Sequence, residues 1–252
     1  MTMRSRAILF ALCLLLLTAA ACLAAPVRVK IVSLDTTLSA VNTQQVRTAL
    51  MYLQPDVLAL QSLRDRPEIA GAPGPVASMA KSLRMYYAYE PAYPGADFGS
   101  ALLSRYPIAK HAPISASAEN KLAGLKADLK VRGATVKVAL IRPRDQAEAK
   151  LSEAAVAKLV REAQKHRLVL MASFDSNAMD TVKAWGRAGL QDAAVALRKP
   201  QLTYPASGPR ERLDYFLVNT KMRPNLKSVG VVTDPRLRGK AEHLPIALAI
   251  QY

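Results

Sequence analysis

Apolar positions along the chain follow two periods, and the two alternate from one segment to the next. Residues 27–34 (VRVKIVSL) alternate basic and apolar side chains before becoming apolar, which is typical of a strand entering a core. Residues 43–53 place apolar side chains at helical spacing, and Pro55 ends that segment. The apolar run at 57–60 then predicts a short strand covered on both faces.

The alternation continues to the end of the chain. The clearest helical pattern lies in residues 147–166, where Leu151, Ala155 and Leu159 fall on one face. Further strands are expected at 99–104, 127–131, 135–141, 168–172, 213–218, 226–232 and 246–250, and further helices at 76–83 and 182–188. Strands and helices interleave without an internal repeat, and some strands join in hairpins. This pattern predicts the α/β class, with a mixed sheet system and helices outside it.

Composition limits the size and the partners of the fold. The 252 residues can bury a sizeable core, and 51% of them are apolar. Lys and Arg number 35 against 19 Asp and Glu, so the net charge is 35 − 19 = +16. This excess indicates an anionic partner, the alternative being a basic surface with no specific ligand.

Residues 1–25 are predicted to form a signal peptide, which leaves 26–252 as a single domain. Arg4 and Arg6 precede an apolar stretch that ends in small residues. An uncleaved anchor is the alternative. Cys22 stands where a lipidated bacterial cysteine would, although Ala19 replaces the usual Leu. The chain is therefore expected to be exported, either periplasmic or secreted, with membrane attachment through Cys22 as an alternative.

The aromatic residues show two further features. Tyrosines at positions 86, 87, 89 and 93 either stack on a base, meet a lipid interface or cover an edge of the core. Trp185, on a predicted short helix, is expected in the core.

Five segments occur in the order found in one known superfamily. They are residues 31–35 (IVSLD), 54–61 (QPDVLALQ), 99–108 (GSALLSRYPI), 168–177 (LVLMASFDSN), and the closing pair 212–216 (RLDYF) and 242–245 (EHLP). The chain thereby resembles the endonuclease/exonuclease/phosphatase superfamily, over essentially its whole length after the predicted signal. The resemblance implies the DNase I-like fold, a four-layer sandwich of two mixed sheets flanked by helices.

The resemblance also implies a chemistry. The superfamily cleaves phosphate esters with a divalent cation such as Mg²⁺ or Mn²⁺, which neutralises charge on the phosphoryl oxygens. Asp214 and His243 match the orienting Asp and the active-site His of the family. A carboxylate beside an imidazole fixes its tautomer and raises its pKa. The alternative is a buried pair kept for packing.

Several acidic positions of the family are replaced in this chain. Ser62 stands where the family has its metal-binding Glu, and Ser173 stands where the fourth segment has Asp. The family's second His has no counterpart in residues 136–144, which offer Arg142 and Arg144 instead. A hydroxyl is a poor substitute for a metal-bound carboxylate. These replacements favour a degenerate site, in which arginines bind a phosphate directly.

The opposite interpretation is a rearranged site. Asp35, Asp175 and Glu242 are carboxylates where the family has Asn, Asn and Asp, and they are the candidate metal ligands. Arg142 and Asn177, together with Asp175, are the candidates for positioning the substrate and the water.

The resulting functional prediction is a metal-dependent phosphoesterase with a divergent site. The alternative is a catalytically inactive pseudoenzyme that binds an anionic partner. In either case the expected ligand is phosphate-bearing or another anion, such as a nucleic acid, a phospholipid headgroup or a phosphate ester. The chain is expected to be a monomer.

Overall fold

The protein is known from a computed structural model, which describes residues 26–36, 43–65, 73–115, 121–235 and 241–252. The predicted signal peptide and part of the Pro- and Gly-rich segment near residue 70 lie outside these ranges. Among the described residues, no helix combines the length and apolarity needed to cross a membrane.

The described strands form two sheets of six strands each. The first sheet runs, in spatial order, β11 (Leu226–Val231), β12 (Ile246–Gln251), β1 (Arg28–Asp35), β2 (Val57–Arg64), β4 (Phe98–Ser104) and β3 (Tyr86–Pro91). The second runs β5 (Ile108–Ser115), β6 (Lys121–Val131), β7 (Ala134–Ile141), β8 (Arg167–Ser173), β10 (Asp214–Asn219) and β9 (Leu190–Asp192). Both sheets are mixed, as predicted: β1 pairs with β2 in parallel and with β12 antiparallel, and β8 pairs with β7 in parallel and with β10 antiparallel.

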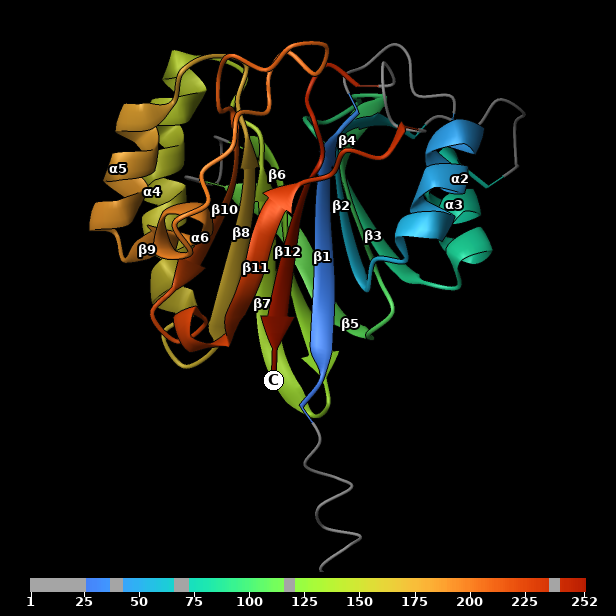
Figure 1. Ribbon diagram of the computed structural model, residues 1–252, viewed down its shortest axis with the longest axis horizontal. Coiled ribbons are helices and arrows are strands. Elements are labelled where there is room, and N and C mark those ends of the chain that lie inside the picture. Colours follow the sequence, from blue (N-terminus) through green and yellow to red (C-terminus); the bar gives the residue numbers. More distant parts are fainter. Residues whose placement is uncertain (1–25, 37–42, 66–72, 116–120, 236–240) are drawn as a thin grey trace, which may run out of the picture.

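Helices cover the outer faces of both sheets and complete four layers (Figure 1). The helices α2 (Thr43–Leu53) and α3 (Pro75–Leu83) pack on the first sheet, while α4 (Gln146–Glu162) and α5 (Met179–Arg187) pack on the second. A short helix α6 (Ala193–Ala196) follows β9, and a 3₁₀ turn (Arg223–Asn225) precedes β11. The predicted α/β sandwich is thus confirmed.

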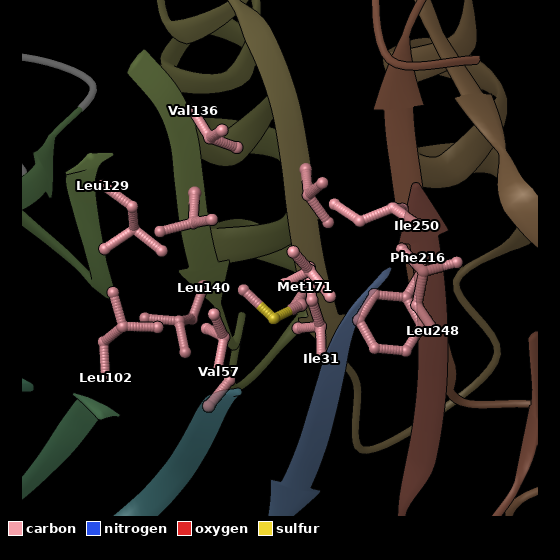
Figure 2. Packing of buried hydrophobic residues seen from close by; sticks show 14 of the residues in the cluster. Ile31, Val57, Leu102, Leu129, Val136, Leu140, Met171, Phe216, Leu248 and Ile250 are labelled. Carbon is pink, nitrogen blue, oxygen red and sulfur yellow. The ribbon is translucent and has the colours of Figure 1, made fainter. Parts of the chain in front are cut away.

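The largest core cluster lies between the two sheets (Figure 2). Ile31, Val57 and Leu248 come from the first sheet, and they meet Leu140 and Met171 from the second. All five are at most 1% exposed. Burial of this apolar area is the main stabilising contribution to the sandwich, and it fixes how the strand ends of one sheet face those of the other.

The boundaries of two helices differ from the sequence prediction. The helix expected over 147–166 ends at Glu162, because β8 begins at Arg167 and the intervening residues must turn the chain. The helix expected from 182 begins earlier, at Met179, whose backbone N–H donates to Asn177 Oδ1 at 3.0 Å. An Asn in this position satisfies one of the free N–H groups at a helix start.

Candidate functional site

The end of β1 lies on the side of the sandwich opposite the C-terminus (Figure 1). Polar side chains from both sheets meet there. Asp35 is the last residue of β1, and Ser173 is the last residue of β8. Asp214 opens β10 directly opposite Ser173, because β10 and β8 are antiparallel. Arg142 follows the last residue of β7, which is parallel to β8. The interleaved topology therefore brings together residues that are far apart in the sequence.

Asp214 and His243 form a buried pair. His243 Nδ1 lies 2.9 Å from Asp214 Oδ2, and the two side chains are 3% and 6% exposed. The ring of Tyr204 packs on the imidazole with 5.0 Å between centroids. Burial opposes a charge on His243, but the hydrogen bond and charge of Asp214, aided by Asp35, outweigh it and raise the pKa of His243. The pair therefore favours a protonated imidazole held in one orientation.

Ser173 connects this pair to Asp35. Its hydroxyl donates to Asp35 Oδ2 over 3.1 Å, and its Oγ lies 3.4 Å from His243 Nδ1. The single Nδ1–H of His243 donates to Asp214 at 2.9 Å, so the 3.4 Å approach of Ser173 Oγ is a close polar contact beside that hydrogen bond. Sequence reasoning noted Ser173 only as a lost carboxylate and missed this bridging position. The sequence offered one signal for it: Ser173 stands at the position where the fourth family segment has its Asp.

Arg142 lies between two carboxylates. Its Nε donates to Asp35 Oδ2 at 2.6 Å, while Nη2 and Nη1 donate to Asp175 Oδ1 and Oδ2 at 2.5 and 3.3 Å. The side chains of Asp35, Arg142 and Asp175 are 0%, 13% and 46% exposed, so the contact runs from the core to the surface. Burial disfavours the guanidinium charge, yet the two carboxylates together raise the pKa of Arg142. We call this series of contacts the polar chain; its members are Asp214, His243, Ser173, Asp35, Arg142 and Asp175.

The other predicted site residues lie outside the polar chain. The side chain of Asn177 accepts from the N–H of Met179, the first residue of α5, and lines an open groove of about 510 Å³ beside Asp175. The side chain of Glu242 is exposed, and its backbone carbonyl accepts from the Ala206 N–H at 2.7 Å. Arg144, expected as a second phosphate ligand, binds Glu148 one helical turn away.

The residues present do not fit a divalent cation. Within the described ranges, no three His, Cys, Asp or Glu side chains gather closely enough to hold a metal ion. Asp35 and Asp175 both bind Arg142, and Glu242 does not join them in a group of three. Ser62, at the position where the resemblance places a Glu, has a left-handed backbone with φ of 57°, where the pairing of β2 with β4 shifts register. The three-carboxylate set for Mg²⁺ or Mn²⁺ is therefore not assembled here.

More than half of the chain matches one family of known protein domains. A family model described as the PGAP2IP C-terminal nuclease-like domain matches residues 23–184. The chain belongs to this family. The match includes Asp35, Arg142 and Asp175 and ends before Asp214 and His243. No curated protein sequence matches the chain closely enough to name a relative.

Solved structures place this member of the nuclease-like family in the endonuclease/exonuclease/phosphatase fold. An endonuclease/exonuclease/phosphatase family protein from Leptotrichia buccalis is 15% identical, with a TM-score of 0.69 over 89% of this chain and 100% of that one. A Neisseria 3′ phosphatase bound to a product DNA hairpin is 18% identical, with a TM-score of 0.68 over 89% and 100%. An AP endonuclease from Archaeoglobus fulgidus is 14% identical, with a TM-score of 0.64 over 88% and 99%. At such identities the likeness establishes the fold, and together with the family match it confirms the predicted superfamily.

Proposed function

We propose that this chain binds a phosphate-bearing anion at the polar chain and does not hydrolyse it through a divalent ion. The proposal is carried by Arg142, whose guanidinium binds two of the three carboxylates predicted to hold a metal. A guanidinium already neutralises part of the charge that an ion would neutralise. The Ser at position 62 further reduces the affinity for magnesium, which prefers carboxylate oxygens and water.

The anion can contact Arg142 at its two outer nitrogens, Nη1 and Nη2. Nη1 and Nη2 bind the two oxygens of Asp175, a half-exposed side chain on the loop after β8. A phosphate group presents two oxygens in a similar arrangement and makes the same fork-shaped contact. It can take the place of Asp175 while the buried bond between Arg142 and Asp35 is kept.

The charge of the whole chain supports an anionic ligand. The net charge of +16 raises the local concentration of anions around the molecule. Protonated His243 adds a positive charge within the polar chain, since its pKa is raised. The Neisseria structure contains a DNA hairpin. We therefore place a nucleic acid phosphate first among the ligands to test, ahead of phospholipid headgroups and small phosphate esters.

A second candidate function is metal-dependent phosphoesterase activity. The observation that favours it is the buried Asp214–His243 pair, which orients an imidazole as acid–base chemistry requires. The carboxylates in the described part of the chain do not gather around a metal ion, so this candidate rests on the pair alone.

Binding and turnover separate the two candidates. Calorimetry in EDTA would titrate the purified chain with inorganic phosphate, a short single-stranded oligonucleotide and anionic phospholipid vesicles. We expect binding without metal, reduced about tenfold or more by Arg142→Met and retained by Arg144→Met, because loss of a bidentate charged contact costs more than about 1.4 kcal/mol. Hydrolysis that requires Mg²⁺ or Mn²⁺ and disappears in His243→Ala would establish the phosphoesterase instead.

Export is proposed from the first 25 residues. A charged start, an apolar stretch and small residues give them the composition of a signal peptide. N-terminal sequencing and mass measurement of the secreted form would locate the cleavage site and detect any lipid on Cys22. They would also test the proposal that residues 26–252 form the mature domain.

A further inference from the structure

Basic side chains collect at the end of the sandwich where β1 begins and where the C-terminus lies (Figure 1). The connections at this end precede β1, β2, β3 and β8, or join β4 to β5, β6 to β7 and β10 to β11. They contain six exposed cationic side chains, Arg84, Arg105, Arg132, Lys165, Lys221 and Arg223. Within the described part of the chain, Asp56 is the one acidic residue of these connections. We call these six side chains the basic end, together with Arg28 and Lys227, which are exposed near the starts of β1 and β11.

Acidic residues collect instead at the opposite end, with the polar chain. Asp35 is the last residue of the eight-residue strand that Arg28 begins, and a strand of this length spans about 23 Å. The connections at its end contain Asp65, Asp97, Asp145 and Asp175. The excess of positive charge is therefore unevenly distributed, and an anionic surface is attracted to the basic end more than to the other.

Exposed tyrosines flank the connections of the basic end. Tyr52 lies one residue before the end of α2 and is 66% exposed, and Tyr86 is the first residue of β3 and is 55% exposed. A Tyr side chain joins an apolar ring to a polar hydroxyl, and it is enriched where lipid meets water. Exposed tyrosines beside lysines and arginines are typical of a surface that meets phospholipid headgroups.

The segment with the composition of a signal peptide joins the domain at the basic end. The Val27 N–H donates to the Tyr252 carbonyl at 3.0 Å, and the Tyr252 N–H donates back at 2.9 Å, so the start of the domain is fixed beside the C-terminus. Cys22 precedes Arg28 by six positions, which span at most about 21 Å. A membrane that held the apolar stretch, or a lipid on Cys22, would therefore lie beside this end of the sandwich.

We propose that the basic end docks on an anionic phospholipid surface and that the polar chain, at the opposite end, faces away from it. Headgroup phosphates contact the exposed Lys and Arg side chains, and each charge near such a surface contributes about fivefold to the affinity. The tyrosines lie at the level of the headgroups. This surface shares no residue with the polar chain, so the docking and the proposed function can fail separately.

Co-sedimentation of the purified full chain with vesicles tests this surface. Vesicles of phosphatidylcholine alone are compared with vesicles that also contain phosphatidylglycerol, at low and at high NaCl. We expect tighter binding to the phosphatidylglycerol vesicles and its loss at high salt, because ions screen exposed charges. Arg28→Gln combined with Lys221→Gln and Lys227→Gln removes three exposed charges of the basic end and should weaken this binding about a hundredfold.

The matched control combines Lys150→Gln, Lys183→Gln and Arg210→Gln. It removes the same net charge from exposed or half-exposed positions on α4, on α5 and before β10, and should weaken binding by less than about fivefold. All variants keep the same first 25 residues, so the contribution of that segment cancels in the comparison. Equal losses in the two triple variants, or equal binding of the native chain to both kinds of vesicle, would overturn the proposal.

Lysine acetylation of the native chain, measured by mass spectrometry, gives a test that needs no variant. Phosphatidylglycerol vesicles should protect Lys221 and Lys227 and leave Lys150 and Lys183 reactive, whereas the reverse pattern overturns the proposal. Arg142→Met should bind these vesicles as the native chain does. If it loses vesicle binding while the basic-end variant keeps it, lipid phosphate binds at the polar chain and the docking is overturned. A basic end that binds a single-stranded oligonucleotide but no vesicle is a nucleic acid surface, which also overturns it.

Discussion

His243 is the single side chain whose ionisation should govern how the protein responds to pH. Burial lowers its pKa, but Asp214 and Asp35 raise it above the ordinary value of 6.5. A folded-state pKa above the unfolded one adds stability that is fully present below about pH 6.5 and is lost as pH rises through the raised value. Asp214→Asn should lower the pKa of His243 and remove most of this contribution.

NMR titration can check the prediction directly, because the chain has three histidines. His111 and His166 serve as internal references in the same spectra, and both should be unaffected by Asp214→Asn. Urea unfolding from pH 5 to 9 should show the native chain losing its advantage over Asp214→Asn towards the alkaline end. A constant difference across this range would mean that Asp214 acts through packing alone.

Asp175 is the residue that should compete with a bound phosphate. Its carboxylate is 46% exposed and takes the outer nitrogens of Arg142, so Asp175→Asn should tighten the binding of inorganic phosphate. Half-exposed ion pairs contribute up to about 1 kcal/mol, which corresponds to an increase in affinity of up to about fivefold. Asp180→Asn is the matched control, since Asp180 lines the same groove but pairs with Lys183. Equal changes in the two variants would indicate general charge repulsion rather than competition for Arg142.

The contacts of Arg142 show which part of the site could not be predicted from the sequence. Asp35, at the end of β1, and Asp175, just after β8, were predicted as site residues because they align with the motifs of the family. Their contact with Arg142 was not, since Arg142 and Asp35 are separated by 107 positions and no periodic pattern encodes a contact at that range. Arg142 is expected to face a phosphate, and the structure adds that it binds two carboxylates.

At the scale of elements, helix α5 should support the loop that carries Asp175. Trp185 is 0% exposed, as expected for a core residue, and its ring lies 5.5 Å from that of Phe174, the residue before Asp175. Trp185→Ala should destabilise the fold by about 3–5 kcal/mol, because the cavity cannot fully collapse. Circular dichroism in urea is the measurement, since the variant lacks the chain's single Trp. Val195→Ala, at a side chain 60% exposed, should change stability by less than about 0.5 kcal/mol.

The elements that the sequence pattern missed share physical causes. Strand β3 contains the tyrosine cluster at the edge of the first sheet, and its exposed and buried positions do not alternate. Strand β5 is an edge strand with Pro113 in it, which weakens any strand prediction. Strand β9 and helix α6 have three and four residues, too few for either period to appear. Central strands were predicted because burial on both faces gives an apolar run.

At the scale of the whole molecule, the net charge of +16 should control binding to a long anion more than binding to a small one. Each oligonucleotide phosphate neutralised by a Lys or Arg releases counterions. The logarithm of the binding constant should therefore fall linearly with the logarithm of the salt concentration, with a slope of about −0.7 per contact. A single inorganic phosphate carries no condensed counterions, so its binding to Arg142 should depend far less on salt. We therefore expect a steep slope for single-stranded DNA and a shallow one for phosphate between about 50 and 200 mM NaCl.

Arg142→Met separates the two contributions in that experiment. The variant should lose most of its affinity for inorganic phosphate, while its slope for single-stranded DNA should decrease by only about one contact. Fluorescence anisotropy with a labelled oligonucleotide gives the slope, and calorimetry gives the phosphate affinity. If the variant loses both to the same extent, DNA binding depends on the polar chain itself. If it loses neither, the anion binds elsewhere on the basic surface, and Arg142 serves only to neutralise Asp35 and Asp175.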